Sequence, residues 1–148
     1  MTFLRSIFQL LIFLGLPLFA GTCLAALGDA PGASDETRHF ATPAGADYSV
    51  QTTSRANGVV VHEYVAAGGR VFALAWAGPF MPDLRELLGS HFDVFVAETA
   101  RLPMAGRSQV VIQRPDLVLF SGGHMRAFTG RAWLPAMLPA GFDPAGIH

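Results

Sequence analysis

The sequence predicts an α+β domain: an antiparallel sheet of five to six strands with one main helix packed across it, after an N-terminal signal peptide. Two observations carry this prediction. Short segments rich in β-branched and aromatic residues, bounded by turn signals, lie on both sides of the middle of the chain. Between them, residues 82–100 repeat apolar side chains at the 3.6-residue period of a helix. This order of elements is typical of a helix laid across an antiparallel sheet.

The first residues have the pattern of a secretory signal peptide. Arg5 precedes a dense apolar core of 13 residues at 7–19, and mostly small residues follow at 20–26. Small side chains three residues and one residue before a peptide bond favour cleavage there, and Cys23 and Ala25 occupy those two positions. The sequence therefore predicts cleavage after Ala25 and export to the periplasm or the extracellular space.

Two alternatives for the N-terminus fit the residues less well. An uncleaved membrane anchor needs about 20 mostly apolar residues, whereas the core at 7–19 is shorter and contains Pro17. A lipid-modified Cys23 is disfavoured by the bulky Thr22 that precedes it. Membrane contact is therefore expected only through the signal peptide, before cleavage.

Composition divides the chain into three parts. Residues 1–25 are the predicted signal peptide, 26–46 a flexible leader rich in Ala, Gly and Pro, and 47–148 a single α+β domain with an extended C-terminal arm. The arm begins near Leu134, where repeated prolines argue against a helix. Because Cys23 is the only cysteine, the mature protein is expected to have no disulfide and no thiol chemistry.

Six segments of the domain are predicted strands: 48–54, 59–65, 70–76, 108–113, 117–120 and 125–133. The strongest pair is a hairpin with its turn at 66–69, in which Val65 is expected to pair with Arg70. This register places one set of side chains toward the core: Val59, Val61, Glu63, Val65, Phe72, Leu74 and Trp76. The opposite face carries Val60, His62, Tyr64, Val71, Ala73 and Ala75. The expected register also brings Glu63 close to Arg70, and the sequence therefore predicts an ion pair between these two side chains.

The predicted helix begins at Pro82 and Asp83, because proline suits the first turn and an acidic residue suits the positive end of a helix. It runs to about Ala100. Gly89 lies inside it, at a cost of about 1 kcal/mol relative to alanine. This cost indicates that a neighbouring element approaches the helix closely at Gly89.

A second hairpin holds the predicted ligand-binding site, which consists of Ser121, Gly122, Gly123, His124 and Arg126. Gly122-Gly123 fits a two-residue turn that needs positive φ. Pairing Ser121 with His124 then places Ser121, His124 and Arg126 on one face. Together with the glycine N–H groups, these side chains could hold a carboxylate or a phosphate. The alternative is an ordinary glycine turn between solvated polar residues.

Patterns for catalysis and metal binding are weak. The chain has no His-x-His or His-Glu-x-x-His spacing, and no Gly-x-Ser-x-Gly motif. His62 and Glu63 are adjacent and so point to opposite faces of a strand, while His91 falls on the apolar stripe of the helix. The sequence therefore predicts no catalytic residue, no metal site and no cofactor. His62, His91 and His124 are weak metal candidates.

The charges argue against nucleic-acid binding. Ten basic residues, all of them arginine, face eleven acidic ones, and no basic run occurs. These observations favour a non-enzymatic periplasmic binding or interaction module whose partner is another envelope protein or a small anionic ligand. Two alternatives stay open: a small histidine-based metal-dependent hydrolase and a structural component of the cell envelope.

The domain also resembles a family of secreted bacterial proteins, domain of unknown function 2844. The resemblance lies in strings at 62–65, 71–73, 76–79, 82–84, 87–89, 121–128, 130–132 and 138–141. Its most specific string is Ser-Gly-Gly-His-Met-Arg-Ala-Phe at 121–128. It covers nearly the whole mature chain and implies a secreted, single-domain bacterial protein. It implies no activity, cofactor or catalytic residue.

Overall fold

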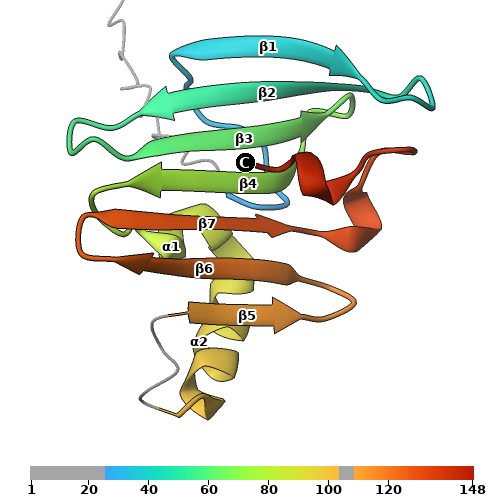
Figure 1. The fold of residues 1–148 in the computed structure, drawn as a ribbon. Helices are drawn as coiled ribbons and strands as arrows, with labels where there is room; N and C mark the ends of the chain where they lie inside the picture. Colours follow the sequence, from blue (N-terminus) through green and yellow to red (C-terminus); the bar gives the residue numbers. More distant parts are fainter. Residues whose placement is uncertain (1–25, 104–108) are drawn as a thin grey trace, which may run out of the picture.

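Seven antiparallel strands form one twisted sheet in the order β1-β2-β3-β4-β7-β6-β5 (Figure 1). The computed structural model describes residues 26–103 and 109–148. The strands are β1 (Glu36–Ala41), β2 (Asp47–Ser54), β3 (Val60–Ala66), β4 (Val71–Gly78), β5 (Gln109–Gln113), β6 (Val118–His124) and β7 (Ala127–Trp133). The predicted α+β class is confirmed, with seven strands rather than five to six.

The helical segment between β4 and β5 is broken at Gly89. It consists of α1 (Leu84–Leu88), the 3-10 turn η1 (Gly89–His91) and α2 (Phe92–Arg101). Asp83 caps α1, because its side chain accepts hydrogen bonds from the N–H groups of Arg85 and Glu86. Gly89 has a φ of 52°, and a Cβ there would lie 2.7 Å from Ala26 Cβ. The predicted close approach at Gly89 is therefore confirmed. In the described parts of the chain, no helix is long and apolar enough to cross a membrane.

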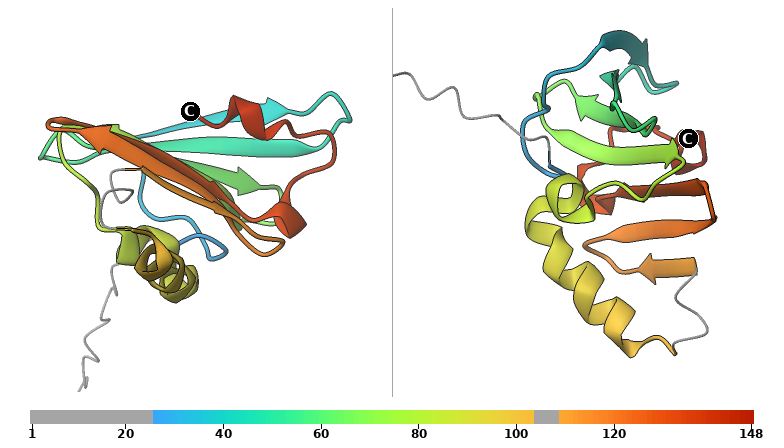
Figure 2. Two further views of the ribbon diagram at one scale, coloured as in Figure 1. Left: turned by 60° about the horizontal axis from the view of Figure 1, so that its bottom comes forward. Right: turned by 90° about the vertical axis from the view of Figure 1, so that its left-hand side faces the viewer.

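Helices lie on one face of the sheet, and the C-terminal arm covers part of the other face (Figure 2). We call the side that α1 and α2 cover the helix face; its core includes Val61, Leu74 and Trp76, all at most 2% exposed. On the other side, the outer face, the C-terminal arm (residues 134–148) packs over the half of the sheet formed by β2, β3 and β4. Its contacts there centre on Phe72, whose ring lies 4.9 Å from that of Phe142. The arm leaves the other half of the outer face open.

The hairpin of β3 and β4 contains an irregularity that exchanges two side chains. From Val61, which pairs with Trp76, to Tyr64, which pairs with Ala73, the register is displaced by two residues from the predicted one. A displacement of two keeps each side chain on its predicted face. The register then shifts, so that Val65 pairs with Val71 instead of Arg70. The prediction was wrong for Val71 and Phe72, because this bulge turns Val71 to the helix face and Phe72 to the outer face.

The segment 26–46 is more ordered than the flexible leader that its composition predicts. It contains β1, which pairs with β2 along its whole length. Leu27 is 1% exposed in the helix-face core, and its N–H donates to Leu87 O at 2.9 Å. The prediction missed these contacts because the partners of the segment lie far away in the sequence. The predicted signal peptide at 1–25 lies outside the described residues.

The predicted ion pair between Glu63 and Arg70 is absent from the described structure. Arg70 Nε donates to Gly28 O at 2.8 Å, whereas Glu63 Oε2 accepts from Gly32 N at 3.4 Å. Glu63 is 6% exposed on the helix face. Burial raises the pKa of Glu63, while the Gly32 N–H and the Arg55 guanidinium oppose this rise and Glu86 adds to it.

Glu63→Gln is therefore expected to stabilise the protein at pH 7.5, by on the order of 1 kcal/mol. A carboxyl group whose folded pKa is raised contributes its full stability below its unfolded pKa, near 4.5, and loses it as pH rises through the folded pKa. Glutamine does not titrate. Urea unfolding at pH 4.5 and 7.5 should show the variant gaining on the wild type as pH rises. An equal difference at both pH values would contradict this prediction.

Candidate functional site

The turn of the β6–β7 hairpin is Met125-Arg126 and not Gly122-Gly123. His124 pairs with Ala127, and Arg126 takes the positive φ of the turn, at 66°. Gly122 and Gly123 lie within β6. A Cβ at Gly123 would lie 2.6 Å from Ala127 O, so this glycine permits a close approach of two strands instead of a turn.

The predicted ligand-binding residues therefore do not share one face. Ser121 is 7% exposed on the helix face, where its Oγ lies 4.0 Å from Met81 Sδ. Gly122 and His124 alternate with it and lie on the outer face. Arg126 lies at the tip of the hairpin. The predicted common face for Ser121, His124 and Arg126 was wrong, because the turn lies three residues later than expected.

The three weak metal candidates lie in three different places. His62 is on β3 at the outer face, His91 is in η1 beside α2, and His124 ends β6. His62 Nδ1 is 3.0 Å from Thr52 Oγ1, and burial, with a smaller effect of His148, lowers the pKa of His62. Across residues 26–103 and 109–148, no group of three or more His, Cys, Asp or Glu side chains could hold a metal ion.

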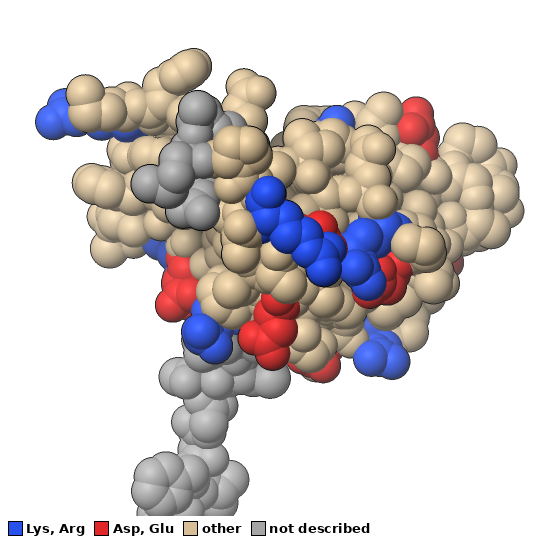
Figure 3. Space-filling view, turned by 90° about the horizontal axis from the view of Figure 1, so that it is seen from below, with Lys and Arg blue, Asp and Glu red and all other residues tan. Residues whose placement is uncertain are grey.

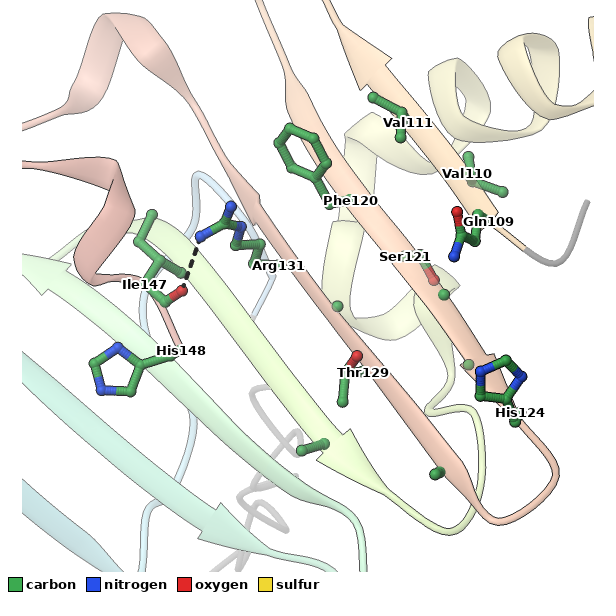
Figure 4. A pocket seen from close by; sticks show the side chains of 15 residues that line it. Gln109, Val110, Val111, Phe120, Ser121, His124, Thr129, Arg131, Ile147 and His148 are labelled. Atoms are coloured by element: carbon green, nitrogen blue, oxygen red, sulfur yellow. Dashed lines mark hydrogen bonds between the residues drawn. The ribbon is translucent and has the colours of Figure 1, made fainter. Parts of the chain in front are cut away.

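A hollow of about 630 Å³ lies on the open half of the outer face, over β4, β7, β6 and β5 (Figure 4). We call it the outer-face hollow. Two rows of paired residues cross its floor from β4 to β5. The first row consists of Ala77, Thr129, Gly122 and Gln109, and the second, which begins at β7, of Arg131, Phe120 and Val111. The first row is low on both sides of Thr129, because Ala77 and Gly122 have little or no side chain.

The hollow also contains the charged residue Arg131, which was not predicted from the sequence as a ligand-binding residue. Arg131 Nη1 donates to Ile147 O at 3.4 Å (Figure 4). Its guanidinium lies 5.1 Å from the ring centroid of Phe120 and 5.7 Å from that of Trp133. The Phe120 and Trp133 rings themselves are stacked. These contacts hold the guanidinium in place at the border of the hollow.

The surroundings of Arg131 differ from those of Arg101 and Arg114. Arg114 pairs with Asp116 and Glu98, and Arg101 also pairs with Glu98. Seen from the side of α2 and β5, blue and red atoms accordingly adjoin one another (Figure 3). None of the ion pairs in the described parts of the chain includes Arg131. Its charge therefore remains available to a ligand.

The end of the C-terminal arm forms one wall of the hollow. Ile147 is 1% exposed in the outer-face core, and both Ile147 and His148 line the hollow. His148 N donates to Tyr64 Oη at 3.2 Å, which fastens this end of the arm to β3. The hollow thus begins where the arm stops covering the sheet.

The lining of the hollow suits an anion better than a cation. It contains Arg131, His124 and His148 but no Asp or Glu. Most of its other members are apolar or small, including Val111, Phe120 and Ala77. Such a lining can bind a small molecule that combines a negative group with an apolar part.

The comparisons with known proteins agree with the resemblance seen in the sequence. Neither a curated protein nor a solved structure matches the chain. One family model, described as "Protein of unknown function (DUF2844)", matches residues 23–147. The chain belongs to this family.

Proposed function

We propose that this protein is an exported, non-enzymatic binding module that holds a small ligand in the outer-face hollow. Export is supported by the signal-peptide pattern of residues 1–25. A binding role is supported by an open, largely apolar surface on a rigid sheet. The separate positions of His62, His91 and His124 give a histidine-based hydrolase no common site among the described residues.

One observation carries the proposal: the hollow combines a volume suited to a small molecule with the restrained guanidinium of Arg131, and no Asp or Glu side chain lines it. Its volume of about 630 Å³ lies within the range of about 300–1,000 Å³ that is usual for ligand pockets. Arg131 lines the hollow, and the Phe120 and Trp133 rings restrain its guanidinium group. A ligand would therefore meet a preorganised surface.

Ala77→Leu is expected to fill the hollow and to raise the dissociation constants of small probes by about tenfold or more. Ala77 is exposed on the floor, so a leucine would project into the hollow instead of the core. Saturation-transfer NMR with octanoate and 1-octanol measures this effect. Ala67→Leu, in the exposed β3–β4 turn, is the matched control and should bind as the wild type does. Unchanged binding in Ala77→Leu would contradict the proposal.

A further inference from the structure

We infer that the ligand of the outer-face hollow is an amphipathic anion, whose acidic group binds Arg131 and whose apolar body lies along β7 toward Ala127. The inference rests on the proposed function, because it assigns a ligand class to the same hollow. It follows from three features: the donors of Arg131, the uncharged floor of the hollow, and the apolar wall on β5 and β6.

The first feature is the set of N–H groups on Arg131. A guanidinium has five donors in a planar fork that matches a carboxylate or phosphate. One of them is directed to Ile147 O, at the long distance of 3.4 Å. The Phe120 and Trp133 rings contact the guanidinium group and restrain its position. The geometry leaves donors for an acidic group that enters from the hollow.

The second feature is the floor that leads away from Arg131. Along β7, Arg131, Thr129 and Ala127 point into the hollow, and these positions span about 13 Å at about 3.3 Å per residue. Ala77 and Gly122 flank Thr129 on the neighbouring strands. No charged side chain lies between Arg131 and Ala127 on this face of β7. An alkyl chain of medium length fits such a floor.

The third feature is the apolar wall on β5 and β6. Val111 is 54% exposed, and it lies across from Phe120. Covering both side chains removes apolar surface from water, which favours binding by about 25 cal/mol per Å². A purely inorganic anion would leave this wall exposed, and a cation would meet the positive charge of Arg131 with no Asp or Glu side chain in the lining to offset it. An anion with an apolar body uses both features.

The test compares three probes that share an eight-carbon chain: octanoate, 1-octanol and octylamine. Calorimetric titration of the purified protein is expected to show tightest binding for octanoate. Arg131→Gln should weaken octanoate binding by about ten- to hundredfold, as expected for the loss of charge-assisted hydrogen bonds. Arg131→Lys keeps the charge without the planar fork and should give an intermediate affinity. Arg126→Gln, at the hairpin tip, is the matched control and should leave the affinity unchanged.

The outcomes separate the two proposals. If 1-octanol bound as tightly as octanoate and Ala77→Leu abolished both, the hollow would remain a binding site but the ligand would not be an anion. Unchanged octanoate binding in Arg131→Gln, with its unfolding temperature preserved, would overturn the inference in the same way. If no probe bound in a manner sensitive to Ala77→Leu, both proposals would fail. If the protein formed a dimer in solution that buried the outer face, the occupant of the hollow would be a second copy of the chain. This result would contradict the inference.

Discussion

Gly130→Ala is expected to destabilise the protein by about 3 kcal/mol or more. A Cβ at position 130 would overlap the ring of Trp76 and lie 2.8 Å from Phe120 O. Trp76 is 2% exposed in the helix-face core, and Phe120 O belongs to the neighbouring strand. Neither partner is the free end of a flexible side chain, so relief requires a shift of β7 or of the indole. Because small domains are stable by only about 5–15 kcal/mol, this loss should be easy to detect.

Urea unfolding followed by near-ultraviolet circular dichroism measures this effect, since the signal reports on the packing of Trp76. Gly68→Ala is the matched control: it lies in the β3–β4 turn, and a Cβ there meets nothing within 4 Å. The control should stay within about 0.5 kcal/mol of the wild type. Equal unfolding midpoints for the two variants would show that β7 does not approach Trp76 as described.

Leu27→Ala is expected to cost about 3 kcal/mol, a loss typical of fully buried leucines. The side chain is 1% exposed in the helix-face core. Its backbone neighbours are also fixed, because Gly28 N donates to Val71 O at 2.8 Å and Val71 N donates to Asp29 O at 2.9 Å. These contacts join the start of the described chain to β4. Truncation of Leu27 would leave a cavity between the sheet and α1.

The same unfolding experiment tests this prediction, with Met125→Ala as its control. Met125 is 95% exposed at the hairpin tip, so its truncation should change the free energy of unfolding by no more than about 0.5 kcal/mol. If Leu27→Ala were as stable as the control, residues 26–29 would behave as the flexible leader that the composition predicts, and this part of the fold would be wrong.

Local patterns predicted most of the elements. The six expected strands and the helical segment are present. They could be predicted because alternation, the 3.6-residue period and the cap at Asp83 depend only on residues that are close in the sequence. β1 escaped prediction because all six of its residues are exposed, so it has no apolar alternation. Its place in the sheet comes from pairing with β2, which brings Phe40 onto Tyr48.

The site was harder to predict because it depends on long-range register. Gly122-Gly123 has the composition of a hairpin turn, but the turn formed at Met125-Arg126, and this difference moved Ser121 to the helix face. Arg131 and Ala77 belong to segments about fifty residues apart in the sequence. They share the hollow only because β7 pairs with both β4 and β6. One local pattern could have pointed to the hollow: the alternation of side chains along β7 places Thr129 and Arg131 on the same face of the sheet.

The most direct test of the central claim, that the outer face of β4, β7 and β6 binds the ligand, is a map of amide chemical shifts. Octanoate is titrated into the ¹⁵N-labelled protein, and each backbone amide is followed. We predict that the largest changes occur at Ala77, Gly122, Thr129 and Arg131. Changes confined to the hairpin tip at Met125 and Arg126 or to the helix face, or no changes at all, would contradict the account.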